Sequence, residues 1–118
     1  MPETEIKNQA CKENPKFCPM AEASKIVGDI WTLLIIRDLL EGDKRFNKLL
    51  ESLNGISSST LTQRLKLLES EGILTRFSFP EIPPHVEYSL TQKGKDLHFV
   101  IEAIRNYGQK YNPQKDLT

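Results

Sequence analysis

The sequence predicts a mainly α-helical domain that carries one small β-hairpin. Apolar residues recur at three- and four-residue spacing over most of the chain, and glycines, aspartates and prolines interrupt this pattern at intervals of one helix. Between residues 73 and 90 the pattern changes to β-branched and alternating residues on either side of a proline-rich turn. The 118 residues suffice for one core. We therefore expect a single domain over 18–111, between a polar arm (1–17) and a polar tail (112–118).

Three helices are expected in the first half of this domain. Pro19 suits the first position of a short helix that ends at Gly28. Asp29 can cap a second helix over 30–40, whose apolar residues cover most of its circumference, so we expect it to be central and buried. Asp43 can cap a third helix, in which the apolar spacing gives an inner face of Phe46, Leu49, Leu50 and Leu53.

A fourth helix, a hairpin and a last helix are expected after the turn at Asn54-Gly55. Ser57 or Ser58 can cap the fourth helix, which should end near Glu71 with Gly72 as its terminator. Strands over 73–79 and 86–90 should form a two-stranded hairpin, because the prolines of 80–84 cannot continue a strand. Thr91 can cap one long helix that reaches about Tyr111. Two short helices followed by a hairpin form the winged helix-turn-helix arrangement.

Overall charge gives no indication of a partner, but local charge does. With 16 basic and 16 acidic residues the chain is formally neutral, so no global field attracts it to nucleic acid or to a membrane. Between residues 52 and 68, however, the only charged side chains are Arg64 and Lys66. Residues 1–5 lack the apolar core of a signal peptide, and no run is long enough to span a membrane. We expect a cytoplasmic protein without a membrane partner, with its two cysteines as reduced thiols.

The fourth helix has the side chains of a DNA-reading helix. Its core stripe is Leu61, Leu65 and Leu68, and at about 100° per residue its other sides carry hydroxyls and hydrogen-bond donors. Such side chains contact base edges in the major groove, while the preceding helix holds phosphates. The candidate DNA contacts here are Arg45, Lys48, Ser58, Ser59, Thr60, Thr62, Gln63, Arg64 and Lys66. Alternatively, the serines and threonines are only a capping cluster, Gln63 and Lys66 a solvated face, and Arg64 the partner of a glutamate in an internal ion pair.

The hairpin offers a second candidate contact. Pro83 and Pro84 stiffen its tip, and His85 is placed where a wing reaches a minor groove or a phosphate, with Lys93 near the start of the next helix. The alternative is a rigid turn that binds nothing. Glu81 would repel phosphate, so we expect fewer contacts from the wing than from the helix.

The last helix has the spacing of a seam between paired helices. Leu97, Ile101, Ile104, Gly108 and Tyr111 are four, three, four and three residues apart. Three further apolar residues widen this stripe: Phe99, Val100 and Tyr107. The alternative is a helix packed only on its own domain. A symmetric dimer would place two reading helices roughly 34 Å apart on a near-palindromic site in double-stranded DNA.

Several short segments, in order, carry a family resemblance. They are Cys18-Pro19, Gly28-Asp29-Ile30-Trp31-Thr32-Leu33-Leu34-Ile35, Arg45-Phe46, Gly55-Ile56-Ser57, Leu61-Thr62-Gln63-Arg64-Leu65, Pro83-Pro84-His85-Val86-Glu87-Tyr88-Ser89-Leu90-Thr91 and Gly94. Together they resemble the HxlR-type family of bacterial transcriptional regulators over roughly residues 18–110. The resemblance implies a dimeric winged-helix DNA-binding protein that controls transcription, often of nearby detoxification or redox genes.

Cys18 is the candidate control point. It precedes a proline at the first helical position, so exposed backbone donors and the helix dipole would favour its thiolate. In the family that the chain resembles, the cysteine of the corresponding Cys-Pro pair senses oxidants or electrophiles in several members. We expect a redox-sensing role here, open to an oxidant or small-molecule effector; the alternative is a packing residue without a regulatory role. Cys11 lies outside the matched segments.

Other chemistry is not expected. Two cysteines with His85 and His98 do not have the spacing of a zinc site, and no glycine-rich phosphate loop or catalytic triad is present, so we expect neither metal, cofactor nor enzyme activity. The main alternative to a DNA-binding regulator is a winged-helix protein-interaction module without sequence-specific DNA binding, which the neutral charge favours. A thiol-redox enzyme is less favoured, because Cys11 and Cys18 are too far apart for a Cys-x-x-Cys centre.

Overall fold

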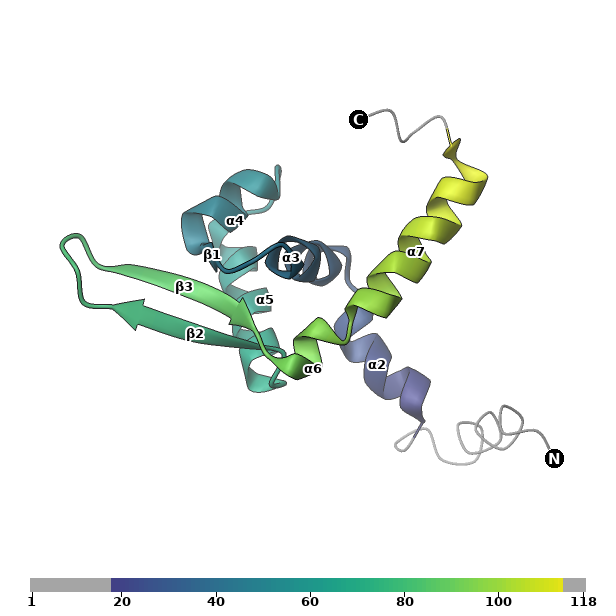
Figure 1. Cartoon of the computed structure of the whole chain (residues 1–118), viewed down its shortest axis with the longest axis horizontal. Helices are drawn as coiled ribbons and strands as arrows, with labels where there is room; N and C mark the ends of the chain where they lie inside the picture. Colours follow the sequence, from purple (N-terminus) through teal and green to yellow (C-terminus); the bar gives the residue numbers. More distant parts are fainter. Residues whose placement is uncertain (1–17, 114–118) are drawn as a thin grey trace.

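The computed structural model describes residues 18–113, which form helices and one small sheet (Figure 1). The elements in chain order are α2 (Pro19–Val27), α3 (Ile30–Leu40), β1 (Lys44–Arg45), α4 (Phe46–Ser52), α5 (Ser58–Ser70), β2 (Leu74–Phe79), β3 (His85–Leu90), α6 (Gln92–Lys95) and α7 (His98–Tyr111). The order of α4, α5 and the β2–β3 hairpin confirms the predicted winged helix-turn-helix. Within the described residues, no helix combines the length and apolarity needed to cross a membrane.

The predicted capping residues set the bounds of the two central helices. The Asp29 carboxylate accepts a hydrogen bond from the Thr32 amide at 2.9 Å, which satisfies a free donor at the start of α3. At the start of α5, Ser57 accepts from the Thr60 amide at 3.0 Å. Gly72 follows the end of α5 with φ of +75°, a backbone conformation that glycine adopts without strain.

The segment before α4 differs from the prediction. Asp43 does not cap this helix; Arg45 occupies the capping position, and the helix begins at Phe46. Lys44 and Arg45 instead form the short strand β1, which pairs antiparallel with Tyr88 and Glu87 of β3. This pairing satisfies backbone groups that an isolated turn would leave to solvent, and it changes the predicted two-stranded hairpin into a three-stranded sheet of order β1-β3-β2.

The predicted long last helix is also divided in two. Thr91 caps only the four-residue helix α6, where its hydroxyl accepts from the Gly94 amide at 3.2 Å. The same hydroxyl lies 2.6 Å from the Gly72 carbonyl oxygen, so α6 is tied to the start of β2. After a turn at Asp96 and Leu97, α7 leaves in a different direction and extends away from the domain (Figure 1).

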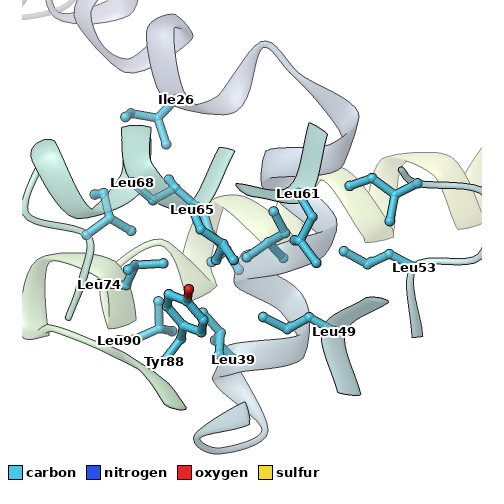
Figure 2. Close-up of a cluster of buried hydrophobic side chains, with 14 of the residues drawn as sticks. Ile26, Leu39, Leu49, Leu53, Leu61, Leu65, Leu68, Leu74, Tyr88 and Leu90 are labelled. Atoms are coloured by element: carbon cyan, nitrogen blue, oxygen red, sulfur yellow. The ribbon is translucent and has the colours of Figure 1, made fainter. Parts of the chain in front are cut away.

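The core lies between α3, α5 and the inner face of the sheet. Figure 2 shows Leu61, Leu65 and Leu68 of α5 pointing toward Leu39 of α3 and Leu74, Tyr88 and Leu90 of the hairpin. All of these side chains are buried, as the predicted stripe of α5 requires. Burial of this stripe fixes the rotation of α5 and therefore decides which of its residues face solvent.

Candidate nucleic-acid interface

The outer side of α5 presents a continuous polar surface. Leu61 and Leu68 are 0% exposed, whereas Ser58, Ser59, Gln63 and Lys66 on other sides of the helix are exposed and Thr62 is half-buried. We call Ser58, Ser59, Thr62, Gln63 and Lys66 the reading face. It combines hydroxyl, amide and ammonium groups, which can bond base edges or phosphates.

The serine and threonine cluster at the start of α5 divides into two parts. The Ser57 hydroxyl donates to the Thr60 hydroxyl oxygen at 2.9 Å, in addition to accepting from the Thr60 amide, so this pair forms the helix cap. Neither the Ser58 nor the Ser59 hydroxyl forms a hydrogen bond within residues 18–113, and both residues face solvent. The capping alternative therefore applies to Thr60, while Ser58 and Ser59 remain accessible to a partner.

Arg64 lies in an internal ion pair. Its Nε donates to Oδ2 of Asp29 at 2.9 Å, and its Nη2 lies 3.4 Å from Oδ1 of the same carboxylate. The hydrogen bond from Arg64 lowers the pKa of Asp29 below its ordinary value, and the bonds from Thr32 act in the same direction against desolvation. The alternative of an ion pair is confirmed, with an aspartate as partner in place of the expected glutamate.

The two support cations are placed differently. Arg45 is exposed and sits in β1 beside Glu87 of β3, at the junction of the sheet with α4. Lys48 is exposed on α4 and lies 3.7 Å from Glu51, a pairing of two largely solvated side chains that is worth little. Both cations are therefore accessible from solvent next to the helix-turn-helix.

Carboxylates surround His85 in the wing, which we define as β2, β3 and the turn at 80–84. Its Nδ1 lies 3.1 Å from Glu81 and its Nε2 lies 2.9 Å from Glu87, while its ring stacks on Phe79 at 4.7 Å between centroids. Only 13% of the side chain is exposed. His85 thus packs within the wing, and a contact with DNA would require one of these pairings to open.

Lys93 lies at the far end of the reading helix. Its ammonium donates to the Glu71 carbonyl oxygen at 2.6 Å, just after the last turn of α5. A 13-residue helix is about 20 Å long, so Lys93 is well separated from Ser58 at the other end. The structure brings Lys93 together with the terminus of α5, where a cation complements the helix dipole.

Arg76 is a residue that the sequence reasoning missed. It lies on β2 opposite Tyr88 of β3, so it projects from the sheet face that packs toward α5. There it lines a groove of about 530 Å³ between α5 and the hairpin, together with Lys66 and Glu69. The sequence contained a signal for this residue. Alternation along β2 places Arg76 on the same face as buried Leu74, and a charged side chain on the core-facing side of a strand is uncommon unless it has a partner or a functional role.

The predicted dimer seam on α7 divides between the core and the surface. Ile101 is only 9% exposed within its own protomer and Leu97 packs against the core, so both side chains contribute to the packing of the protomer itself, and their part in a dimer seam stays a prediction. Val100 and Gly108 are half-buried. The exposed apolar side chains of α7 are Phe99, Ile104, Tyr107 and Tyr111. Tyr107 and Tyr111 also contact each other, with ring centroids 5.1 Å apart.

Cys18 occupies the predicted capping position of α2, but not as a thiol. It precedes Pro19 with an extended backbone, it is buried, and it forms a disulfide. The expectation of a reduced cysteine is therefore wrong for this structure; the chain's other cysteine, Cys11, lies outside the described residues. Within residues 18–113, no cluster of three or more histidine, cysteine or acidic side chains could hold a metal ion.

Comparison with known proteins supports this geometry. The family described as HxlR-like helix-turn-helix matches residues 26–116. The HTH-type transcriptional regulator sll1512 of Synechocystis sp. is 38% identical over 112 residues, 95% of this chain and 83% of the relative. The redox regulator HypR in its oxidised form superposes with a TM-score of 0.74 at 31% identity, covering 79% of this chain and 96% of HypR. The reduced form of the transcriptional regulator YodB from B. subtilis superposes with a TM-score of 0.70 at 36% identity, covering 80% of this chain and 94% of YodB.

These proteins are named as regulators and not as enzymes. Because the family match covers most of the described residues and includes α5 and the hairpin, the chain belongs to the HxlR-like helix-turn-helix family of transcriptional regulators.

Proposed function

We propose that the protein binds double-stranded DNA as a homodimer and regulates transcription from a near-palindromic operator. The observation that carries the proposal is the exposed reading face of α5, which is free of carboxylates and is held by a core stripe on its opposite side. In a helix-turn-helix this surface enters the major groove, where Gln63 can pair with adenine and Lys66 with guanine or a phosphate.

In this proposal the Asp29–Arg64 ion pair gives Arg64 a structural role in place of base recognition. Its guanidinium joins the middle of α5 to the first turn of α3, so it sets the position of the reading helix on the domain. Base recognition would then fall to Gln63 and the free hydroxyls of Ser58 and Ser59. Arg45 and Lys48 would hold the phosphates that flank the groove.

The dimer is proposed from the exposed side chains of α7. Phe99, Ile104 and Tyr107 are about half to three-quarters exposed in one protomer, which is unusual for large apolar side chains on one helix. Met20 of α2 is exposed as well. A two-fold axis near α7 would cover these side chains and leave α5 and the wing of each protomer free for a half-site.

Regulation through Cys18 is a further part of the proposal. HypR has been solved in oxidised and reduced forms, and YodB in reduced and diamide-treated forms. Here Cys18 is the N-cap of α2, whose buried residue Ile26 packs in the core beside α5. Making or breaking the disulfide would shift α2 and, through it, the dimer and the spacing of the two reading faces.

The decisive experiment is a mobility-shift assay with the DNA that flanks the protein's own gene, repeated across salt concentrations. We expect binding that weakens steeply with salt, because phosphate contacts release counterions, and a footprint with two related half-sites. No binding at low salt would favour the alternative, a winged-helix module that binds protein. For the redox part, operator binding is compared before and after diamide and dithiothreitol; equal responses of the wild type and Cys18→Ser would refute a role for Cys18.

A further inference from the structure

A groove of about 530 Å³ lies between α5 and the hairpin, next to the reading face. Its lining includes Phe46 of α4 and Tyr88 of β3. The lining also carries three exposed charged side chains, which we call the rim: Lys66 and Glu69 of α5 and Arg76 of β2.

The two cations of this rim are available to a ligand. Within residues 18–113, the Arg76 guanidinium donates one hydrogen bond, to the Ser78 hydroxyl at 3.3 Å, and neither cation forms an ion pair there. Glu69 lies within the same groove and yet forms no ion pair with Arg76. The rim therefore has a net charge of +1, with donors that can hold an anion from two sides.

We propose that this groove is a phosphodiester site, in which Arg76 and Lys66 hold one backbone phosphate of the DNA. The inference rests on the proposed function. When α5 lies in the major groove and the wing reaches the adjacent minor groove, the strand that separates the two grooves must pass between α5 and the hairpin. Arg76 is the cation that the wing contributes on the inner side of this passage, where neither Glu81 nor Glu87 lies.

The other polar groups of the groove limit where the phosphate binds. The Thr62 hydroxyl already donates to the Ser58 carbonyl oxygen at 2.8 Å, so the two cations supply the donors. Glu69 follows Lys66 by three residues on α5 and repels a phosphate at that end of the groove. The phosphate is thus expected near the Lys66 end, and Glu69 reduces the affinity of the site.

The test measures DNA affinity by fluorescence anisotropy, with the operator fragment and an unrelated duplex of equal length. Arg76→Ala should weaken binding about tenfold on both duplexes and reduce the slope of log affinity against log salt by about 1. Arg76→Gln removes the charge but keeps the three-carbon stem and a polar end, so it should give the same result and controls for a disturbance of the strand by alanine. Glu69→Gln should tighten binding about two- to fivefold on both duplexes. Lys95→Ala on α6, which removes one charge away from the groove, should change neither quantity.

The outcomes separate the inference from the function on which it rests. If the wild type binds neither duplex, the proposed function fails and the phosphate site with it. If the wild type binds the operator with a steep salt dependence, while Arg76→Ala and Arg76→Gln keep its affinity and slope, only the phosphate site is refuted. A loss confined to the operator would also refute it, because a phosphate contact is independent of sequence.

Discussion

At the scale of single residues, two arginines show how tertiary contacts assign roles. Arg64 lies in the reading helix, but its guanidinium is bound by Asp29 from the start of α3. Arg76 lies on a strand and lines the groove beside the reading face, without an ion pair among residues 18–113. The arginine in the expected place therefore stabilises the fold, and the other is the better candidate for contact with DNA.

The Asp29–Arg64 pair predicts a pH-dependent contribution to stability. Asp29→Asn retains a good N-cap but loses the ion pair, so it should lower the free energy of unfolding at neutral pH by about 0.5 kcal/mol, a value reduced for the partial exposure of both side chains. Because the fold lowers the pKa of Asp29 below 3.8, this contribution is full above that value and is lost as the pH falls through the folded pKa.

Urea denaturation of the wild type and Asp29→Asn at several pH values checks this prediction. The two unfolding free energies should differ by a constant amount down to about pH 5, begin to converge at about pH 4, and meet only below the lowered pKa of Asp29. A difference that persisted unchanged in acid would show that the ionised carboxylate is not its source. Glu22→Gln on α2, whose carboxylate pairs with Lys25 at the surface, is the matched control.

Gln63 is expected to read sequence and not to stabilise the fold. Gln63→Ala should reduce operator affinity by about 1–3 kcal/mol and leave binding to unrelated DNA and the melting temperature unchanged, since an amide bonds an adenine edge in the groove. Anisotropy titrations on both duplexes measure the effect. Gln92→Ala, the same change on exposed α6, is the control and should leave the affinity for both duplexes unchanged. If Gln63→Ala reduced the affinity for both duplexes equally, Gln63 would be assigned to phosphate binding.

At the scale of elements, the connection from the hairpin to α7 positions the wing. Gly94 of α6 packs against the end of α5 and the start of β2, where a Cβ would overlap the Ile73 carbonyl oxygen and lie 2.8 Å from Leu90 Cδ2. Thr91 and Lys93 bind the same region through the carbonyl oxygens of Gly72 and Glu71. The start of β2, the end of β3 and the end of the reading helix are thereby joined into one unit.

Gly94→Ala should therefore be destabilising even though alanine favours helices. We expect a loss of about 2 kcal/mol in the free energy of unfolding, because the added methyl group has no space against backbone atoms. Thermal and urea denaturation measure this loss. Lys95→Ala, on the same helix with an exposed side chain, should change stability by less than about 0.5 kcal/mol, and an unchanged Gly94→Ala would show that α6 can move away from β2.

At the scale of the whole molecule, the two proposed interaction surfaces lie apart. The wing projects from one end of the domain and α7 from the other, with α3 and the core between them (Figure 1). Residues of α7 near its start pack on this core, whereas Ile104, Tyr107 and Tyr111 extend beyond it. This arrangement allows pairing through α7 without covering the reading face.

Two substitutions on α7 should separate dimerisation from folding. Ile104→Glu, at an exposed position, should give a folded monomer with greatly weakened operator binding, because a charge is costly in a dry interface. Ile101→Glu should instead unfold the protomer, since it places a charge in the core. Light scattering with size-exclusion chromatography gives the oligomeric state and circular dichroism the fold. Asn106→Glu, at another exposed position of α7, is the control. If the Ile104→Glu variant were still a dimer, the exposed apolar face of α7 would be excluded as the dimer interface.

The sequence alone was sufficient for the order of the helices up to the hairpin, the cap at Asp29, the hairpin and the family, and it limited the cap of α5 to Ser57 or Ser58. These features depend on local periodicity and on backbone groups near the ends of helices, so neighbouring residues determine them. The pairing of β1 with β3, the break before α7 and the burial of Ile101 depend on residues distant in the chain. The environments of Arg64 and Arg76 likewise depend on residues distant in the chain. A side chain's type shows what it can bind, but only packing decides whether a group of its own protein already occupies it.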